Sequence, residues 1–395
     1  MKRTTERILT THVGSLARPD ALVPVLKAKD RAQPYDRDAY ARLVREAVAD
    51  VVRRQTEAGV DIITDGEQSK ASFFGYIVER FTGFERQPAP PGQEGSTRAG
   101  SREFRDFPDY YAWSDRIAEW AGGRGNTRQF GVDVCTGPVT YRGEAAVQAD
   151  IDTLRAAVQG RPHEEVFLPA IAPSYIFATL PNRHYRTDEE YEQALADALH
   201  QEYRAIVDAG FVLQVDDPRL VTYYMMNPGL SVAECRAWAA RRVEAINHAL
   251  RGIPPERVRF HTCYSIDVGP RVHDMALRDI VDVLFRIKAG AFSFEAANPR
   301  HEHEWAVWRD AAIPEDKTLV PGVLDSTCNY IEHPELVAQR ILTFTDIVGP
   351  ERVMGGTDCG FGTWSGFGAI DPDICWAKLG SLSEGARRAT ERASA

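Results

Sequence analysis

Runs of β-favouring residues alternate with amphipathic helical stretches along the chain, and this alternation restricts the fold more than any other feature. Nine apolar runs are strand candidates: 8–15, 60–64, 132–140, 166–171, 211–215, 258–265, 291–295, 319–324 and 352–359. Helices are predicted between many of them, over 36–58, 145–158, 188–209, 232–250, 275–288 and 334–348. Alternation at this spacing is typical of parallel βαβ units.

Eight parallel strands would close a (β/α)8 TIM barrel, an α/β fold, and we expect 166–171 to be the run that does not take part. A doubly wound open sheet is the alternative. No Gly-x-Gly-x-x-Gly follows the first strand to favour it. The pattern lapses in the Pro- and Gly-rich residues 87–126, which we interpret as an insertion within one domain spanning 1–395. Its aromatic residues predict that part of it packs back as a cover.

Several of the predicted strands end in side chains that can bind a metal. His261 and Cys263 lie two residues apart, so an extended backbone points both to one face. Glu295 and Cys359 end two later strands. Imidazole, thiolate and carboxylate together suit Zn²⁺. The competing interpretation is a buried cysteine beside a hydrogen-bonded histidine, and at this point the two are about equally supported.

Composition narrows the class of protein. The 395 residues carry a formal charge of −10 without a basic block, which argues against a nucleic-acid partner. No apolar stretch is long enough for a membrane span, and the N-terminal residues do not resemble a secretory signal. Six cysteines spread over this length do not indicate a disulfide framework. We therefore expect a cytoplasmic protein with reduced thiols.

Five short motifs make the sequence recognisable: Gln-Val-Asp-Asp-Pro (214–218), His-Thr-Cys-Tyr-Ser (261–265), Phe-Glu-Ala-Ala-Asn (294–298), Pro-Gly-Val-Leu-Asp (321–325) and Thr-Asp-Cys-Gly (357–360). In this order they resemble the catalytic barrel of cobalamin-independent methionine synthase. The residues that follow Glu295 and Cys359 look closer to the epoxyalkane:coenzyme M transferase branch of that superfamily. The resemblance covers nearly the whole chain.

The resemblance implies a zinc ion held by His261, Cys263, Glu295 and Cys359. It also implies that the substrate thiol faces Gly14, Ser15, Glu67 and Asp216, since the matching carboxylates of the synthase hold the amine of homocysteine. Two positions depart from the synthase. Thr327 stands where it has a histidine, and residues 139–144 lack the tryptophan that packs against its folate. Methyltetrahydrofolate is therefore a poor candidate for the donor.

A free thiol is mostly protonated at neutral pH, and zinc would make it a nucleophilic thiolate. Our main hypothesis is a zinc-dependent alkyl transferase that directs a small thiol at an alkyl or epoxide-type electrophile. The first alternative is a compact methionine synthase acting on homocysteine, and the second is a non-catalytic barrel that binds a metal or ligand. A proton donor would come from Asp325, Tyr264 or His12.

The substrate group at the end opposite the thiol should distinguish these hypotheses. A sulfonate would need a cation, for which Arg18 and Arg219 are the candidates, whereas an amino acid would use Glu67 and Asp216. Asp217 is expected to orient backbone, and His301 to lie in a solvated polar stretch. A homo-oligomer is left open.

Overall fold

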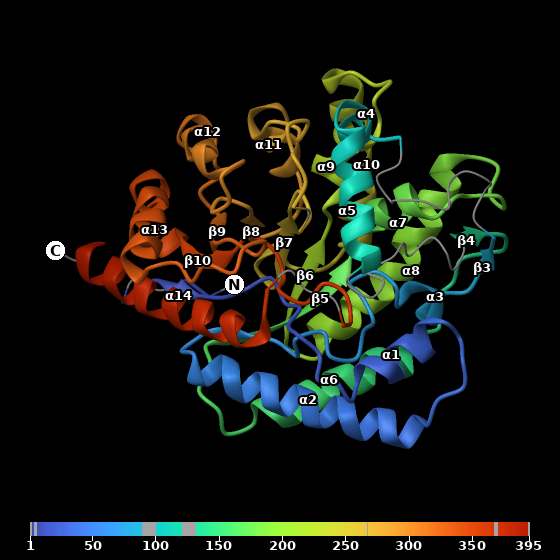
Figure 1. Ribbon diagram of the computed structural model, residues 1–395, viewed down its shortest axis with the longest axis horizontal. Coiled ribbons are helices and arrows are strands. Elements are labelled where there is room, and N and C mark those ends of the chain that lie inside the picture. The colour runs from blue at the N-terminus through green and yellow to red at the C-terminus, as the bar shows by residue number, and fades with distance from the viewer. Residues whose placement is uncertain are drawn as a thin grey trace.

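An eight-stranded parallel barrel forms the centre of the computed structural model, which describes residues 2–3, 6–88, 100–120, 132–266, 268–366 and 370–393 (Figure 1). The strand order is β1-β10-β9-β8-β7-β6-β5-β2. The bounds are β1 Leu9–Thr10, β2 Ile62–Ile63, β5 Glu165–Ile171, β6 Val212–Asp216, β7 Val258–Thr262, β8 Ala291–Phe294, β9 Thr318–Leu324 and β10 Met354–Thr357. A parallel bridge between Thr11 and Ile62 joins the two end strands and closes the sheet. The predicted (β/α)8 barrel is confirmed.

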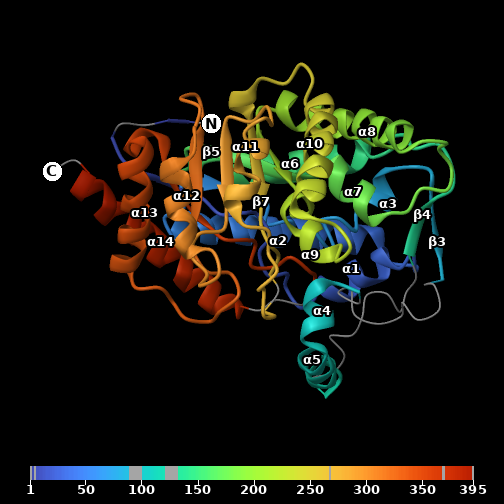
Figure 2. The ribbon, with the colours of Figure 1, turned by 90° about the horizontal axis from the view of Figure 1, so that it is seen from above.

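Helices follow the strands and cover the outside of the barrel (Figure 2). Their bounds are α1 Val23–Asp30, α2 Arg37–Glu57, α3 Ile77–Arg80, α6 Glu144–Val158, α7 Pro173–Thr179, α8 Asp188–Asp208, α9 Arg219–Met226, α10 Val232–Ala249, α11 Val281–Leu284, α12 Trp305–Asp310, α13 Pro334–Val348 and α14 Pro372–Ala393. Local sequence sets several of their starts. Thr187 caps α8 by accepting the Glu190 amide, as its spacing predicts, and Ser231 and Glu234 form a capping box on α10. None of the helices in the described ranges combines the length and the apolar content that a membrane crossing needs.

One strand prediction is wrong. The run 166–171 belongs to the barrel as β5, whereas 132–140 contains the short strand β4 (Val132–Cys135), which lies outside it. β4 pairs antiparallel with β3 (Phe84–Gln87). A short apolar run looks the same in a hairpin and in a buried parallel strand, so sequence pattern alone could not separate them.

The helix predicted over 275–288 is also wrong, because only short pieces form there. Ile280 has an extended φ of −137° and separates a 3-10 turn at 277–279 from α11. Its β-branched neighbours Val281 and Val283 contribute to low helix propensity in this stretch.

The antiparallel strands β3 and β4 flank the predicted insertion. Within 87–126 the structure describes residues 87–88 and 100–120, which include α4 (Arg102–Asp106) and α5 (Pro108–Trp120). α4 packs beside α9: Arg102 donates to the carbonyls of Tyr224 and Asn227 at 2.9 and 3.2 Å. This short helix therefore packs against a helix of the barrel, whereas the role of the insertion as a cover stays a prediction. The assignment of 1–395 to one domain stays a prediction.

The barrel interior is filled in layers. The first is apolar and consists of Leu9, Ile62, Phe167, Val212, Ala291, Val320 and Met354. Above it lies what we call the Arg259 layer, formed by Thr11, Gln214 and Arg259. Next come the side chains at the carboxyl ends of the strands, the face on which barrel active sites lie. We call Glu67, His261, Cys263 and Cys359 the mouth layer.

Candidate metal and thiol site

Strand β7 delivers the first two members of the site. Arg259, His261 and Cys263 alternate with Phe260 and Thr262, so all three point into the barrel. β7 pairs with β6 such that Asp216 is the partner of His261. Cys359 arrives from the loop after β10, on the opposite side of the mouth.

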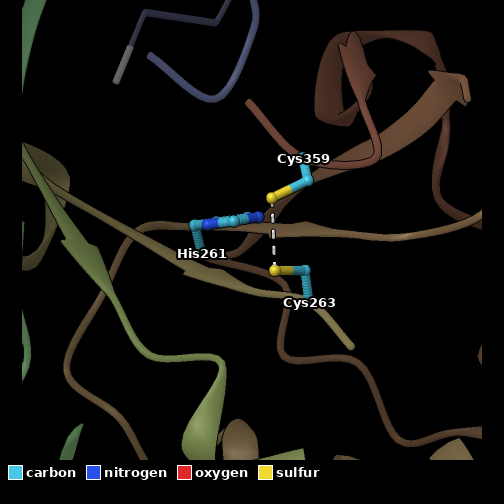
Figure 3. Close-up of side chains that lie close together, drawn as sticks. All are labelled: His261, Cys263 and Cys359. Carbon is cyan, nitrogen blue, oxygen red and sulfur yellow. Dashed lines mark hydrogen bonds between the residues drawn. The ribbon is translucent and has the colours of Figure 1, made fainter. Parts of the chain in front are cut away.

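His261, Cys263 and Cys359 converge at the mouth (Figure 3). Their nitrogen and sulfur atoms all lie within 4.8 Å of one another, and the two Sγ atoms are 3.4 Å apart. All three residues are buried. Asp216 accepts a hydrogen bond from Nδ1 of His261 at 2.9 Å, which leaves Nε2 turned toward the sulfurs. A carboxylate behind a metal-binding histidine fixes its tautomer in this way. One nitrogen and two sulfur donors with that support fit Zn²⁺.

The charges around this group also favour a cation. Burial by itself lowers the pKa of His261, but Cys263 and Asp216 outweigh it and raise the pKa to about 10. The hydrogen bond to Cys359 and burial raise the pKa of the Cys263 thiol well above its usual value. The raised pKa of Cys263 favours the protonated thiol. A bound divalent cation favours the thiolate instead, because it displaces the thiol proton.

Glu295, the fourth predicted ligand, is not part of the donor group in the described residues. Its Oε1 accepts the Tyr264 amide at 2.7 Å. Its Oε2 accepts hydrogen bonds from Nη2 of Arg271 at 2.7 Å and from the side-chain Nδ2 of Asn298 at 2.6 Å. The structure thus brings three of the four predicted ligands together and places the fourth beside them, in an ion pair.

Glu67 lies on the other side of the mouth, after β2. It is buried and adopts a left-handed φ of 55°. Its Oε2 has no hydrogen-bond partner and lies 3.8 Å from Nη2 of Arg18, a long ion pair. Gly14 faces it: a Cβ on Gly14 would stand 3.6 Å from Oε1 of Glu67. Burial raises the pKa of Glu67 to about 7, with a further contribution from Asp216 and against the attraction of Lys70 and Arg18. A buried carboxylate oxygen that accepts no hydrogen bond is suited to bind a cationic ligand group.

The other predicted substrate residues differ in how far their polar groups are already hydrogen-bonded within the protein. The Ser15 carbonyl accepts the amides of Phe361 and Gly362 at 2.9 and 3.1 Å, which ties the 14–15 loop to the segment after Cys359. Arg18 is fully buried, and its guanidinium donates to main-chain carbonyls, including those of Leu16, Glu67 and Lys70. It is therefore occupied as a structural group.

Arg219 is freer than Arg18. It lies over the ring of Tyr175, 5.3 Å from the centroid, and its buried Nε has no hydrogen-bond partner. Its neighbour Asp217 accepts the amides of Arg219 and Leu220 at the start of α9, so the expectation that Asp217 orients backbone is confirmed.

The three candidate proton donors lie in different surroundings. His12 uses both ring nitrogens inside the protein, toward Gln55 Oε1 at 2.8 Å and the Gly14 amide at 3.2 Å. Burial lowers its pKa to about 4. The Tyr264 hydroxyl donates to the Met275 carbonyl at 2.6 Å. Asp325 accepts the amide and hydroxyl of Thr327 through one oxygen, Oδ1. The geometry leaves Asp325 the freest of the three.

Sequence reasoning missed Asp358, the residue before Cys359. Its carboxylate accepts the amides of Ala296, Ala297 and Asn298 at 2.8 to 2.9 Å. Gly322 makes room for it, since a Cβ there would stand 2.1 Å from Oδ1 of Asp358. Asp358 therefore fixes the Cys359 loop against the segment after Glu295. The acidic residue inside Thr-Asp-Cys-Gly was the available signal.

Comparison with known proteins agrees with this geometry. The family described as the catalytic domain of cobalamin-independent synthase matches residues 8–161 and 177–370. The methionine synthase of Thermococcus kodakarensis is 26% identical over 382 residues, which are 95% of this chain and 91% of the relative. That of Sulfolobus acidocaldarius is 24% identical over 352 residues, 89% and 85% of the two chains.

Solved structures show the same fold. A B12-independent methionine synthase from Shewanella sp. W3-18-1, in complex with selenomethionine, has a TM-score of 0.70 at 19% identity and covers 98% of both chains. One from Listeria monocytogenes, described as putative, has a TM-score of 0.65 at 18% identity, with 97% of this chain covered. Since the family match spans most of the sequence, this chain belongs to the cobalamin-independent methionine synthase family through its catalytic domain, and it is a methyl-transferring enzyme.

Proposed function

We propose that this enzyme transfers a methyl group to the sulfur of homocysteine, with a zinc ion held by His261, Cys263 and Cys359. The observation that carries the proposal is that this donor group shares the barrel mouth with Glu67, one of whose buried carboxylate oxygens accepts no hydrogen bond. The donor group would hold the zinc that binds the thiol end of an amino thiol, and Glu67 would bind its ammonium group.

The residues of the chain divide the work. Zinc supplies the positive charge that keeps the substrate sulfur as a thiolate. Asp216 holds His261 in the tautomer that presents Nε2 to the sulfurs. Burial of the donor group keeps water from the nucleophile. Asp325 is our candidate for delivering a proton to the leaving group, because its Oδ2 is not taken up by the Thr327 contacts.

The hydrogen bonds that the candidate arginines already make favour homocysteine over a thiol that carries a sulfonate. Arg18, one of the two candidates for binding a sulfonate, is committed to main-chain carbonyls. Arg219 keeps a buried Nε without a partner and is the one observation in favour of the second candidate function, alkyl transfer to a thiol such as coenzyme M. The proposed donor is an activated methyl group other than methyltetrahydrofolate. Tyr141, in the stretch where the synthase has its folate tryptophan, is buried against Phe81.

Zinc-edge X-ray absorption with a thiol panel tests this function. We expect the zinc-loaded protein to gain a sulfur ligand with homocysteine and not with coenzyme M. Glu67→Gln should weaken homocysteine uptake about 10- to 100-fold, the worth of a charge-assisted hydrogen bond. It should leave 4-mercaptobutyrate, which lacks the amine, unchanged. Glu85→Gln on exposed β3 is the matched control. A new sulfur ligand with coenzyme M alone would favour the second candidate.

A further inference from the structure

Some buried charged side chains take no part in the proposed chemistry, and one of them corrects a sequence prediction. His301 is 2% exposed, so the prediction that it lies in a solvated stretch is wrong. Asp274 and Glu304 pair with its two ring nitrogens at 3.0 and 2.8 Å and offset the loss of water around the ring. A second buried group, built around Lys378, reaches the candidate proton donor.

Lys378, on the last helix α14, forms an ion pair with Glu332 in the loop 325–333 between β9 and α13. Its Nζ lies 2.7 Å from Oε2 of Glu332, and the two side chains are 0% and 7% exposed. The pair holds both main-chain groups of Asp325. Glu332 Oε1 accepts the Asp325 amide at 2.8 Å, and Lys378 Nζ donates to the Asp325 carbonyl at 3.1 Å. Ser381, one turn further along α14, donates to the Glu332 carbonyl.

Asp325 needs such partners because it is the first residue beyond the strand. β9 ends at Leu324, whose carbonyl accepts the Asp358 amide at 3.0 Å, so Asp325 lies beside the loop that carries Cys359. Its own main-chain groups must then find partners outside the sheet. Neutral groups would satisfy them, and a buried ion pair adds little stability over apolar residues of the same size. Hydrogen bonds to charged groups are, however, shorter and stronger, so the pair fixes the position of Asp325 closely.

The Asp325 side chain is oriented from its other end. The amide and the hydroxyl of Thr327 both donate to Oδ1, at 2.8 and 2.7 Å. With the main chain held by the ion pair and Oδ1 held by Thr327, the direction of Oδ2 is set. α14 packs along α13 and against β9, so the cation that completes this arrangement comes from outside the barrel (Figure 1).

We propose that Lys378 is a positioning residue that acts through Glu332 and the Asp325 main chain to fix Asp325 Oδ2 for proton delivery. The proposal rests on the proposed function, which gives Asp325 that role. It assigns the last helix, which supplies no member of the mouth layer, a part in the reaction. It also predicts that loss of Lys378 slows only those transfers whose leaving group needs a proton.

Two small electrophiles, given to the zinc-loaded protein with homocysteine, separate these transfers. With methyl iodide the sulfur bonds to carbon, the carbon–iodine bond breaks, and iodide leaves with the electron pair and needs no proton. With oxirane the sulfur bonds to a ring carbon and the carbon–oxygen bond breaks. The oxygen keeps the electron pair and takes a proton, which protonated Asp325 would supply.

We expect Lys378→Met to slow the oxirane reaction about 10- to 100-fold and the methyl iodide reaction less than about 3-fold, since small displacements of a reacting group cost this much. Asp325→Asn should show the same split. Arg242→Met, which breaks a buried ion pair with Glu192 between α10 and α8, is the control and should show no split.

Amide hydrogen exchange supplies a readout that does not depend on activity. Followed by mass spectrometry, the segment 319–333 should exchange about 10-fold faster in Lys378→Met and at the wild-type rate in Arg242→Met. Unchanged exchange in Lys378→Met would mean that the ion pair does not hold Asp325, and would overturn the inference.

The kinetic outcomes separate this inference from the proposed function. A split in Asp325→Asn without one in Lys378→Met, or an equal loss of both rates in Lys378→Met, overturns the positioning role and leaves the proposed function standing. A wild-type protein that binds zinc and reacts with methyl iodide but not with oxirane also overturns it, since no protein proton reaches the oxygen. If the wild type binds no zinc, the proposed function falls and the inference with it. Should Lys378→Met fail to fold, the double variant Glu332→Gln/Lys378→Met, which buries no unpaired charge, replaces it.

Discussion

Two neighbouring layers inside the barrel are built on shared strands but use their polar groups in opposite ways. In the Arg259 layer the guanidinium donates to Gln214 Oε1, Thr11 Oγ1 and the His12 carbonyl and lies 3.8 Å from the centroid of Phe167. Two residues further along the chain from Arg259, the mouth layer presents His261 and Cys263, together with Cys359 and the Glu67 oxygen that accepts no hydrogen bond.

The difference shows how one barrel separates stability from chemistry. Burial lowers the pKa of Arg259 to about 9, against the attraction of Asp216, so it stays cationic at neutral pH with its hydrogen bonds made inside the protein. The mouth layer gathers donor atoms that are not saturated by hydrogen bonds inside the protein, and a ligand or metal would complete it. Substitutions in the two layers should therefore fail in different assays.

The largest effect is expected in the mouth layer. Cys263→Ser should weaken zinc binding by about 1,000-fold or more, because it removes a ligand and loss of a supporting partner alone costs 10- to 100-fold. Metal analysis after dialysis against a chelator measures this. Cys235→Ser, a buried cysteine on α10, is the control and should keep its zinc and lose a similar amount of stability. Full zinc content in Cys263→Ser would remove the basis for the assigned site.

A smaller effect, of the opposite kind, is expected one layer below. Arg259→Met should lower the free energy of unfolding by about 3 kcal/mol, since it leaves the Gln214 and Thr11 acceptors unpaired in the interior. Denaturant unfolding measures the loss. At saturating metal the folded variant should still bind one zinc per chain. A variant of unchanged stability that lost its zinc would erase the contrast between the layers.

The smallest effect is a pH dependence from His12, which adjoins the Arg259 layer. Its pKa falls from 6.5 to about 4 on folding, through burial. The unfolded chain therefore binds the proton first, and stability is full above pH 6.5 and declines as the pH drops toward 4. Between about pH 7 and pH 5 the wild type should lose about 2 kcal/mol more than His12→Gln. Unfolding measurements at the two pH values test this. An equal loss of stability in the wild type and in His12→Gln would contradict a buried, neutral His12.

Much of the fold and part of the site follow from the sequence alone. Strand–helix alternation is a local property, so it predicts the barrel, and the two-residue spacing predicts that His261 and Cys263 share a face. That Cys359 joins them follows from the resemblance, since the ends of parallel strands meet at one face. The choice of β5 over β4 does not follow, because a short apolar run does not by itself specify which strand it pairs with.

Tertiary structure decided which polar residues are left free. Arg18 and Glu67 are both buried at the mouth and equally plausible as substrate ligands by type. Backbone carbonyls occupy the guanidinium of Arg18, whereas one oxygen of Glu67 accepts no hydrogen bond. Glu295 likewise has the right type and position for a ligand, and only the tertiary structure brings Arg271, held by Glu103 from the insertion, to pair with it. Residue type determines which bonds a side chain can make, but long-range packing determines which of them are already made.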